Sequence, residues 1–192
     1  MRITGGEFGG RMLTAPNDAR VRPTADKVRQ AIFNILAHND FGMEFTLSRA
    51  LVADLFAGTG ALGIEAISHG AAYCLFVDVS AESRALIREN VEALGLTGVT
   101  KIWRRNATDL GPMPAGSGGP FNLVFLDPPY RQNLLVPAMQ SLAAGRWLSP
   151  DAVLVAEMAE EESMAPPAAF SLLDQRQYGD TRVAVFRAKG IG

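Results

Sequence analysis

The chain is poor in the residues on which several common kinds of site depend. Its 192 residues include a single cysteine, Cys74, and two histidines, His38 and His69. One cysteine cannot form an internal disulfide, and these three residues do not match the ligand spacing of a zinc or iron–sulfur site. Apolar runs end long before the roughly 18 residues that a membrane span needs, and residues 1–10 lack the apolar core of a signal peptide. We therefore expect a soluble, cytoplasmic protein without a metal.

Charge is distributed unevenly along the chain. Apolar residues make up 48% and charged residues 20% of the sequence, as in one or at most two compact domains, and the formal net charge is -2. Such a balance is not typical of a protein that coats nucleic acid. Residues 1–34, however, hold six basic and three acidic residues, so the remainder of the chain is acidic. This basic arm is a candidate contact for nucleic acid, although charge runs are often only solvated surface.

From residue 49 onward, short apolar runs alternate with amphipathic stretches, a pattern typical of strand and helix units that build a parallel sheet. We predict strands at 50–55, 72–78, 99–103, 121–126 and 152–156, and a closing antiparallel hairpin from 170–175 and 182–187. Helices are predicted at 61–69, 80–94 and 134–144, with loops at 111–120 and, because of three adjacent glutamates, a solvated connection at 157–167. Before the sheet, residues 1–14 are predicted to form a small hairpin or arm, followed by a helix that starts at Pro23 and Thr24. The fold class is therefore α/β, with a doubly wound, mostly parallel, seven-stranded sheet.

A glycine-rich cluster follows the first predicted strand. Gly58, Gly60 and Gly63 match G-x-G-x-x-G, and Asp78 ends the next strand 20 residues after Gly58. Glycines there let the backbone approach a ligand at a helix N-terminus, and a carboxylate at the Asp78 position can accept hydrogen bonds from ribose hydroxyls. The pattern predicts a cofactor that contains a nucleoside, and it does not by itself exclude NAD. The alternative is a tight strand–helix turn that binds no ligand.

Asp54, just before the glycines, helps to choose between the cofactors. A carboxylate at this point would repel a pyrophosphate but would pair well with the ammonium group of S-adenosylmethionine. Asp54 could instead only cap the loop.

A second cluster, Asp127-Pro128-Pro129-Tyr130, ends the predicted strand 121–126. The prolines fix the backbone, so that the Asp127 side chain and the Pro128 carbonyl can both accept the protons of an exocyclic amine. Tyr130 offers a flat face on which a base can stack. The cluster predicts an acceptor site for an amine beside the cofactor.

These motifs resemble those of class I S-adenosylmethionine-dependent methyltransferases that modify exocyclic nitrogens. The segments RITGG at 2–6, GR at 10–11 and RPTADKVRQAIFNIL at 22–36 narrow the resemblance to the RsmD family, the bacterial 16S ribosomal RNA guanine-N2 methyltransferases. The resemblance covers nearly the whole chain. It implies a Rossmann-like class I methyltransferase fold, with an N-terminal RNA-binding arm and helix at 1–40 and the methyltransferase domain at 41–192. It further implies a monomer that uses S-adenosylmethionine to methylate guanine 966 of 16S rRNA in the small (30S) subunit.

The resemblance also assigns roles to individual residues, and it favours the functional interpretation of the basic arm. The implied catalytic residues are Asp127, Pro128, Pro129 and Tyr130. The implied cofactor-binding residues are Asp54, Phe56, Ala57, Gly58, Thr59, Gly60, Asp78, Asn106, Ala107 and Asp127. The implied RNA contacts are Arg2, Arg11, Arg22, Lys27 and Arg29. Asn106 departs from the aspartate with which many relatives of the wider class hold the adenine amine, although an asparagine carbonyl can accept the same bond.

Three alternatives stay open at the level of the sequence. An NAD-dependent oxidoreductase would share the glycines and Asp78 but leaves Asp54 and the Asp127–Tyr130 motif unexplained. A non-catalytic ribosome-assembly factor could keep the pocket without the activity. Since the acceptor motif recognises an amine and not a particular base, a DNA adenine-N6 or protein glutamine-N5 methyltransferase is also compatible.

Overall fold

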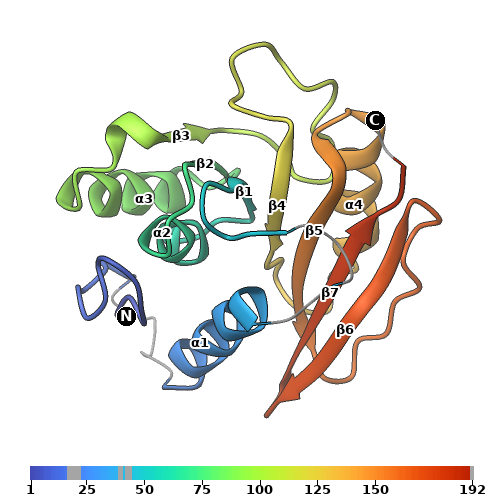
Figure 1. Ribbon diagram of the computed structural model, residues 1–192, viewed down its shortest axis with the longest axis horizontal. Coiled ribbons are helices and arrows are strands. Elements are labelled where there is room, and N and C mark those ends of the chain that lie inside the picture. Colours follow the sequence, from blue (N-terminus) through green and yellow to red (C-terminus); the bar gives the residue numbers. More distant parts are fainter. Residues whose placement is uncertain (17–22, 39–40, 42–44, 191–192) are drawn as a thin grey trace.

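The computed structural model describes residues 1–16, 23–38, 41 and 45–190, and in them seven strands form one sheet (Figure 1). The strands are β1 (Leu51–Leu55), β2 (Tyr73–Val77), β3 (Thr100–Trp103), β4 (Phe121–Leu126), β5 (Leu148–Ala159), β6 (Phe170–Tyr178) and β7 (Thr181–Ala188). Their order is β3-β2-β1-β4-β5-β7-β6. Strands β1 to β5 pair in parallel, whereas β7 is antiparallel to both β5 and β6. The predicted mostly parallel sheet with a closing hairpin is confirmed.

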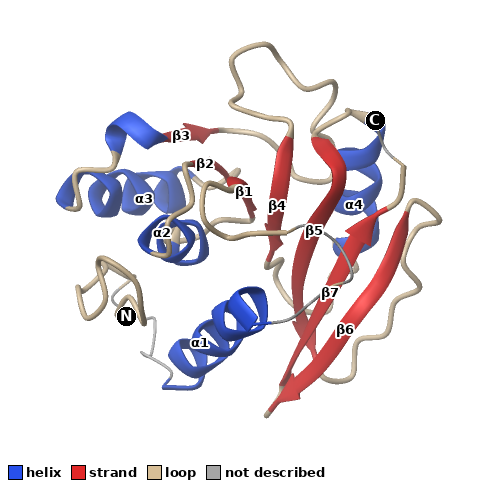
Figure 2. Cartoon of the chain, viewed as in Figure 1, coloured by secondary structure: helices blue, strands red, loops and turns tan. Residues whose placement is uncertain are grey.

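Helices cover both faces of this sheet (Figure 2). They are α1 (Pro23–His38), α2 (Ala61–Ser68), α3 (Ala81–Ala93) and α4 (Leu135–Ala144), with a short 3-10 helix at Thr97–Val99. Apolar side chains of α1, α2 and α3 share one core with Leu123 and Phe125 of β4, and those of α4 share the other with Val124 and Leu126. Because β4 is covered on both sides, its sequence is apolar almost throughout. No helix in the described ranges is both long and apolar enough to cross a membrane.

Local signals in the sequence position the helices that follow the strands. The Ser80 hydroxyl accepts a hydrogen bond from the Ser83 N–H at 3.2 Å and so caps α3, as its residue type predicts. Gly95, with a φ of 71°, follows the end of that helix in a conformation that favours glycine.

The predicted connection at 157–167 is wrong for its first three residues, because β5 continues to Ala159. Glu157 pairs with Val183 and Ala159 with Thr181, so the antiparallel ladder with β7 extends the strand past the predicted end at 156. Glu157 therefore belongs to a central strand and is not a solvated residue of a loop.

The N-terminal arm is anchored to α2. An isolated bridge pairs Arg2 with Met12, and the Glu7 N–H donates to the Ser68 carbonyl at 2.8 Å. Ile3 and Leu13 are buried in the core that α1 and α2 share with the sheet. The arm thus runs along α2, from the Ser68 end of that helix to the loop before it, where the Asn90 amide donates to the carbonyls of both Thr14 and Thr59 at 3.0 Å.

Candidate active site

Three carboxylates from adjacent strands meet at the carboxyl end of the sheet. Asp54 lies in β1, Asp127 directly follows β4, and Glu157 lies in β5. The chain order of the strands reverses at β1 and β4, which is where open α/β sheets bind their ligands. The three side chains line one cavity of about 150 Å³. The cavity is also lined by Met1, Ala25, Arg29, Phe56, Ala57, Gly58, Thr59, Ala61 and Leu62.

The loop between β1 and α2 forms one wall of this cavity. Phe56, Gly58 and Gly60 have positive φ values of 57°, 57° and 79°. Such a φ is uncommon outside glycine, and a non-glycine residue that adopts it is often part of a functional site. At Gly63 a Cβ would lie 2.4 Å from the Phe76 ring, so only glycine lets α2 pack this closely on β2. The loop thus has the geometry of a backbone cradle for a ligand.

Two carboxylates hold the cradle in place. The Gly63 N–H donates to Asp54 Oδ2 at 2.9 Å. Asp78 accepts from the Gly58 N–H at 2.9 Å and from the Ser80 N–H at 2.8 Å, one bond on each oxygen. Asp54 therefore does cap the loop, and it lines the cavity as well. A carboxylate has about four acceptor positions, so each of these side chains can still accept from a ligand.

The cavity carries an excess of negative charge. Burial raises the pKa of Asp54 well above its ordinary value, and the Asp127 and Asp78 charges raise it further, while the Gly63 hydrogen bond opposes them. Burial, together with the charge of Asp127, likewise raises the pKa of Glu157 well above its ordinary value. Arg29 is the one basic side chain among the described residues that line the cavity. This environment favours a ligand with a positive charge or several hydrogen-bond donors and disfavours a pyrophosphate.

Of the residues in the Asp127–Tyr130 motif, Asp127 lines this cavity, whereas Pro128 and Pro129 line a separate cavity of about 280 Å³. The Asp127 side chain faces the open space, yet the surrounding protein desolvates it and raises its pKa from 3.8 to about 6. Pro128 is buried and Tyr130 is half-buried. The Tyr130 hydroxyl and Thr181 Oγ1 lie 3.0 Å apart, so a hydrogen bond to β7 fixes the ring. The motif therefore presents an acceptor carboxylate and an anchored aromatic ring.

Asn106 and Ala107 do not line this cavity. The Asn106 side-chain oxygen Oδ1 accepts from the Thr108 N–H at 3.0 Å and from the Thr108 hydroxyl at 2.9 Å. Ala107 is buried against the core on the α4 side. Both follow β3, whose neighbour β2 ends just before Asp78. Their predicted contact with adenine stays a prediction, and it would compete with the bonds to Thr108.

Arg29 does not lie on the surface, where a phosphate contact would require it. It is 4% exposed, and its Nε lies 3.0 Å from Glu65 Oε2. One terminal nitrogen lies 2.7 Å from Asp26 Oδ1 and also donates to the Arg2 carbonyl. Glu65 in turn accepts from the Thr4 and Gly5 N–H groups. The expectation that Arg29 contacts RNA is corrected accordingly: its guanidinium is used to join the arm, α1 and α2.

Three other basic residues of the arm and helix are exposed. Arg2 and Lys27 line one surface depression beside the arm, and the Arg11 guanidinium extends over the end of α3 toward the Ala93 carbonyl. Arg22 lies outside the described residues. The structure therefore offers Arg2, Arg11 and Lys27 as accessible cations.

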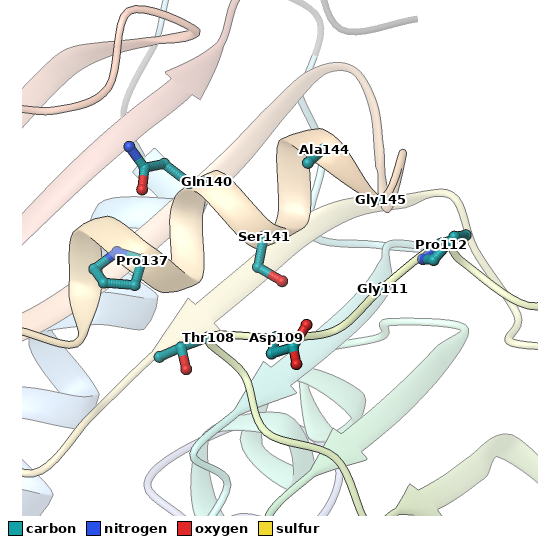
Figure 3. Close-up of a pocket in the computed structure, with 9 residues that line it drawn as sticks. All are labelled: Thr108, Asp109, Gly111, Pro112, Pro137, Gln140, Ser141, Ala144 and Gly145. Carbon is teal, nitrogen blue, oxygen red and sulfur yellow. The ribbon is translucent and has the colours of Figure 1, made fainter.

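A separate cavity of about 390 Å³ lies between α4 and the loop after β3 (Figure 3). Thr108 and Asp109 face Pro137 and Ser141 across it. The Ser141 hydroxyl accepts from the Leu110 N–H at 2.7 Å and ties the loop to α4. This cavity shares no lining residue with the acidic one, and Asp127 lies outside it.

Glu157 is the acidic residue of this cavity that the sequence prediction missed. The rule that identified Asp54 and Asp127, a carboxylate at the end of an apolar strand, also applies to Glu157, which follows Ala152–Ala156. The three adjacent glutamates at 160–162 instead led to the prediction of a solvated connection that began at residue 157.

Comparisons with known proteins show similarity over nearly the whole chain. The family model described as "Conserved hypothetical protein 95" matches residues 1–187. The chain is 34% identical over 191 residues to the protein YlbH of Bacillus subtilis, covering 99% of this chain and all of that one. It is 34% identical over 194 residues to ribosomal RNA small subunit methyltransferase D of Escherichia coli, covering 100% of this chain and 92% of that protein. The solved structure of yhhF from Escherichia coli superposes with a TM-score of 0.79, at 30% identity and with 98% of each chain covered.

Proposed function

The chain belongs to the RsmD family, and from that premise we propose that it transfers a methyl group from S-adenosylmethionine to the N2 amine of guanine 966 in 16S rRNA. The observation that carries the proposal is the cluster of Asp54, Asp127 and Glu157 in one cavity at the switch point of the sheet. An acidic cavity suits an ammonium group on one side and an amine donor on the other. We place the activity on the small ribosomal subunit and hence in the cytoplasm.

Asp54 and Asp78 have the chemistry that the two polar ends of this cofactor require. Asp54 lines the cavity and can pair with the ammonium group, and Asp78, at the end of β2, can accept hydrogen bonds from the ribose hydroxyls. The glycine cradle between them lets the ligand contact the backbone closely. When bound, the cofactor supplies an electrophilic methyl group on a sulfonium, which needs no metal for its activation.

Asp127 and the Pro128 carbonyl are suited to orient the target amine. The lone pair of that amine is delocalised into the guanine ring, which makes it a poor nucleophile. If these two oxygens accept the two amine protons, the nitrogen becomes more tetrahedral and its lone pair can be aimed at the methyl group. The base must leave its stack to reach the cavity, and the anchored Tyr130 ring offers it a new surface for stacking.

Arg2, Arg11 and Lys27 are the described cations that we assign to the RNA backbone, and Arg22 remains part of that prediction. Arg2 and Lys27 are exposed and share one depression beside the arm. Contacts of this kind position an enzyme on RNA without specifying a base.

The direct test is methyl transfer from labelled S-adenosylmethionine to small subunits that lack modifications, followed by mapping of the labelled nucleotide. Label on N2 of guanine 966 supports the proposal, and Asp127→Ala provides the matched inactive control. Label on a glutamine of a ribosomal protein, or on DNA offered in a parallel reaction, would instead support one of the alternative substrates. Cofactor binding without any transfer would favour an assembly factor, and calorimetry with NAD in place of S-adenosylmethionine tests the oxidoreductase alternative.

A further inference from the structure

Glu157 and Asp127 lie side by side at the ends of neighbouring parallel strands. The register pairs Leu126 of β4 with Ala156 of β5, so the next residues along the two strands are Asp127 and Glu157. Side chains alternate between the faces of a sheet, and Phe125 and Val155 pack in the core on the α1 side. Asp127 and Glu157 therefore point to that same face, where both line the acidic cavity.

No described residue forms a hydrogen bond or an ion pair with either carboxylate of this pair. Neither carboxylate accepts a hydrogen bond from the described residues, and their pKa values are raised by burial and, for Glu157, by neighbouring acids. Arg29 lies near Glu157 and lowers its pKa, but its ion pairs are with Glu65 and Asp26. No buried polar atom of a described side chain lacks a partner, so the oxygens of the pair are open to the cavity. Two adjacent, unpaired carboxylates destabilise a fold, and a ligand with several donors would relieve that cost.

We propose that Glu157 recognises the N1–H of the target guanine while Asp127 holds the neighbouring N2 amine, so that Glu157 selects guanine over other amine-bearing bases. This inference rests on the proposed function. On the Watson–Crick edge of guanine, N1–H and N2–H₂ are adjacent donors, and two adjacent carboxylates match them. Adenine has a lone pair at N1, which a carboxylate repels. A site built around a donor rejects an analogue that lacks the donor, because a buried acceptor is then left unpaired.

The test compares two target bases in otherwise identical small subunits. Subunits are reconstituted around 16S rRNA that carries either guanine or 2-aminopurine at the target position. 2-Aminopurine keeps the exocyclic amine but has a lone pair at N1 in place of N1–H. The parent enzyme is expected to methylate guanine with a kcat/KM at least about 100-fold higher than for 2-aminopurine.

Glu157→Gln is the informative variant, because an amide can accept from N1–H or donate to an N1 lone pair. We expect this variant to reduce the ratio of kcat/KM on guanine to kcat/KM on 2-aminopurine at least about tenfold. Its affinity for S-adenosylmethionine, measured by calorimetry, should be unchanged. Glu160→Gln, a neighbouring exposed glutamate, is the matched control and should keep the parent ratio. An unchanged base preference in Glu157→Gln, or an equal reduction in rate on both bases, would overturn the inference.

A second variant covers the case in which Glu157→Gln does not fold. Glu157→Asp keeps the charge but withdraws the acceptor by one methylene, and we expect at least about a tenfold lower kcat/KM on guanine with the cofactor affinity retained. A parent rate in Glu157→Asp would overturn the inference. A parent enzyme that methylates neither base would instead refute the proposed function itself, and with it this role of Glu157.

Discussion

The two halves of the candidate site hold their carboxylates in opposite ways. On the cofactor side, Asp54 and Asp78 accept backbone N–H groups from the loop that they support. On the acceptor side, Asp127 and Glu157 accept none from the described residues, and burial raises the pKa of both, as it also does for Asp54. The difference lies in the hydrogen bonds: a carboxylate bonded to backbone amides is fixed by the chain, whereas Asp127 and Glu157 have no such bond to offset their desolvation. On the proposed assignment, the chain organises the cofactor half by itself, and the substrate would complete the acceptor half.

Glu65 is the most completely paired of the acids near the site, and removing its partner should have the largest effect on stability. Arg29→Ala leaves the fully buried Glu65 without its arginine partner, with His69 Nε2 3.5 Å away as the remaining basic neighbour. We expect the free energy of unfolding to fall by about 3–5 kcal/mol. Urea denaturation measures this change. Arg176→Ala, which breaks an exposed ion pair with Asp174, is the control and should cost at most about 1 kcal/mol. Equal effects of the two variants would contradict the structural role of Arg29.

Asp127 should dominate the chemistry of the acceptor half. Asp127→Ala is expected to lower the single-turnover methylation rate about 10²–10³-fold, because the amine loses the acceptor that orients it. Asp127→Asn keeps one acceptor oxygen and should retain measurable activity, and both variants should bind the cofactor normally. If the carboxylate had to take a full proton during transfer, the two substitutions would be about equally damaging. A fully active Asp127→Ala enzyme would remove the acceptor half from the site.

Asp78 tests the cofactor half in the same way. Asp78→Ala removes the acceptor proposed for the ribose and also releases the Gly58 and Ser80 N–H groups. We expect affinity for S-adenosylmethionine to weaken by about 1.5–3 kcal/mol in calorimetry, the range for hydrogen bonds to a charged group. Arg84→Ala, which removes a side chain that bonds to the backbone carbonyl of Asp78, is a nearby control with a smaller expected effect. Unchanged affinity in Asp78→Ala would exclude Asp78 from the cofactor site.

The contrast between the halves also explains what could be predicted from the sequence. The strands, α3 and the glycine loop follow from local signals such as apolar periodicity, the Ser80 cap and glycine spacing. The bonds of Asn106 to Thr108 are equally local, since asparagine often bonds to the backbone two residues on.

The two features that the sequence did not predict, the length of β5 and the burial of Arg29, depend on residues far away in the sequence. β5 extends through Glu157 because β7, more than twenty residues later, pairs with it. Arg29 is buried because Glu65, 36 residues away, faces it. Neither partner is visible in the composition of the local segment, which in both cases indicated solvent exposure.

The arm provides a smaller and more distributed effect. Replacing Arg2, Arg11 and Lys27 together by alanine should weaken binding to small subunits and leave cofactor affinity unchanged. The dependence of log K on log salt should flatten by about 0.7–0.9 for each phosphate that the variant no longer neutralises. A variant that removes Arg176, Arg187 and Lys189 near the closing hairpin changes the net charge equally and serves as the control. Identical salt slopes for the two variants would indicate that the basic residues of the arm are only solvated surface.

The smallest expected effect is the pH-dependent change in Tm when a carboxylate of the site loses its charge, and this change differs in size between the two halves. Asp127 has a pKa of about 6 in the folded protein and an ordinary value of 3.8. Above about pH 6 its negative charge is present in both states and destabilises the folded one. Below about pH 4 the group is protonated in both states, and this destabilisation is absent. Asp127→Asn should therefore raise the Tm at pH 7.5, and this gain should shrink as the pH falls from about 6 to about 4. Asp54→Asn is the comparison in the cofactor half: it also removes a buried charge, but it replaces the charge-assisted bond from the Gly63 N–H by a weaker neutral one, which offsets part of its gain. Thermal unfolding of both variants across this pH range measures the difference. A lower Tm for Asp127→Asn at pH 7.5 would show that the protein itself, and not the substrate, satisfies this carboxylate.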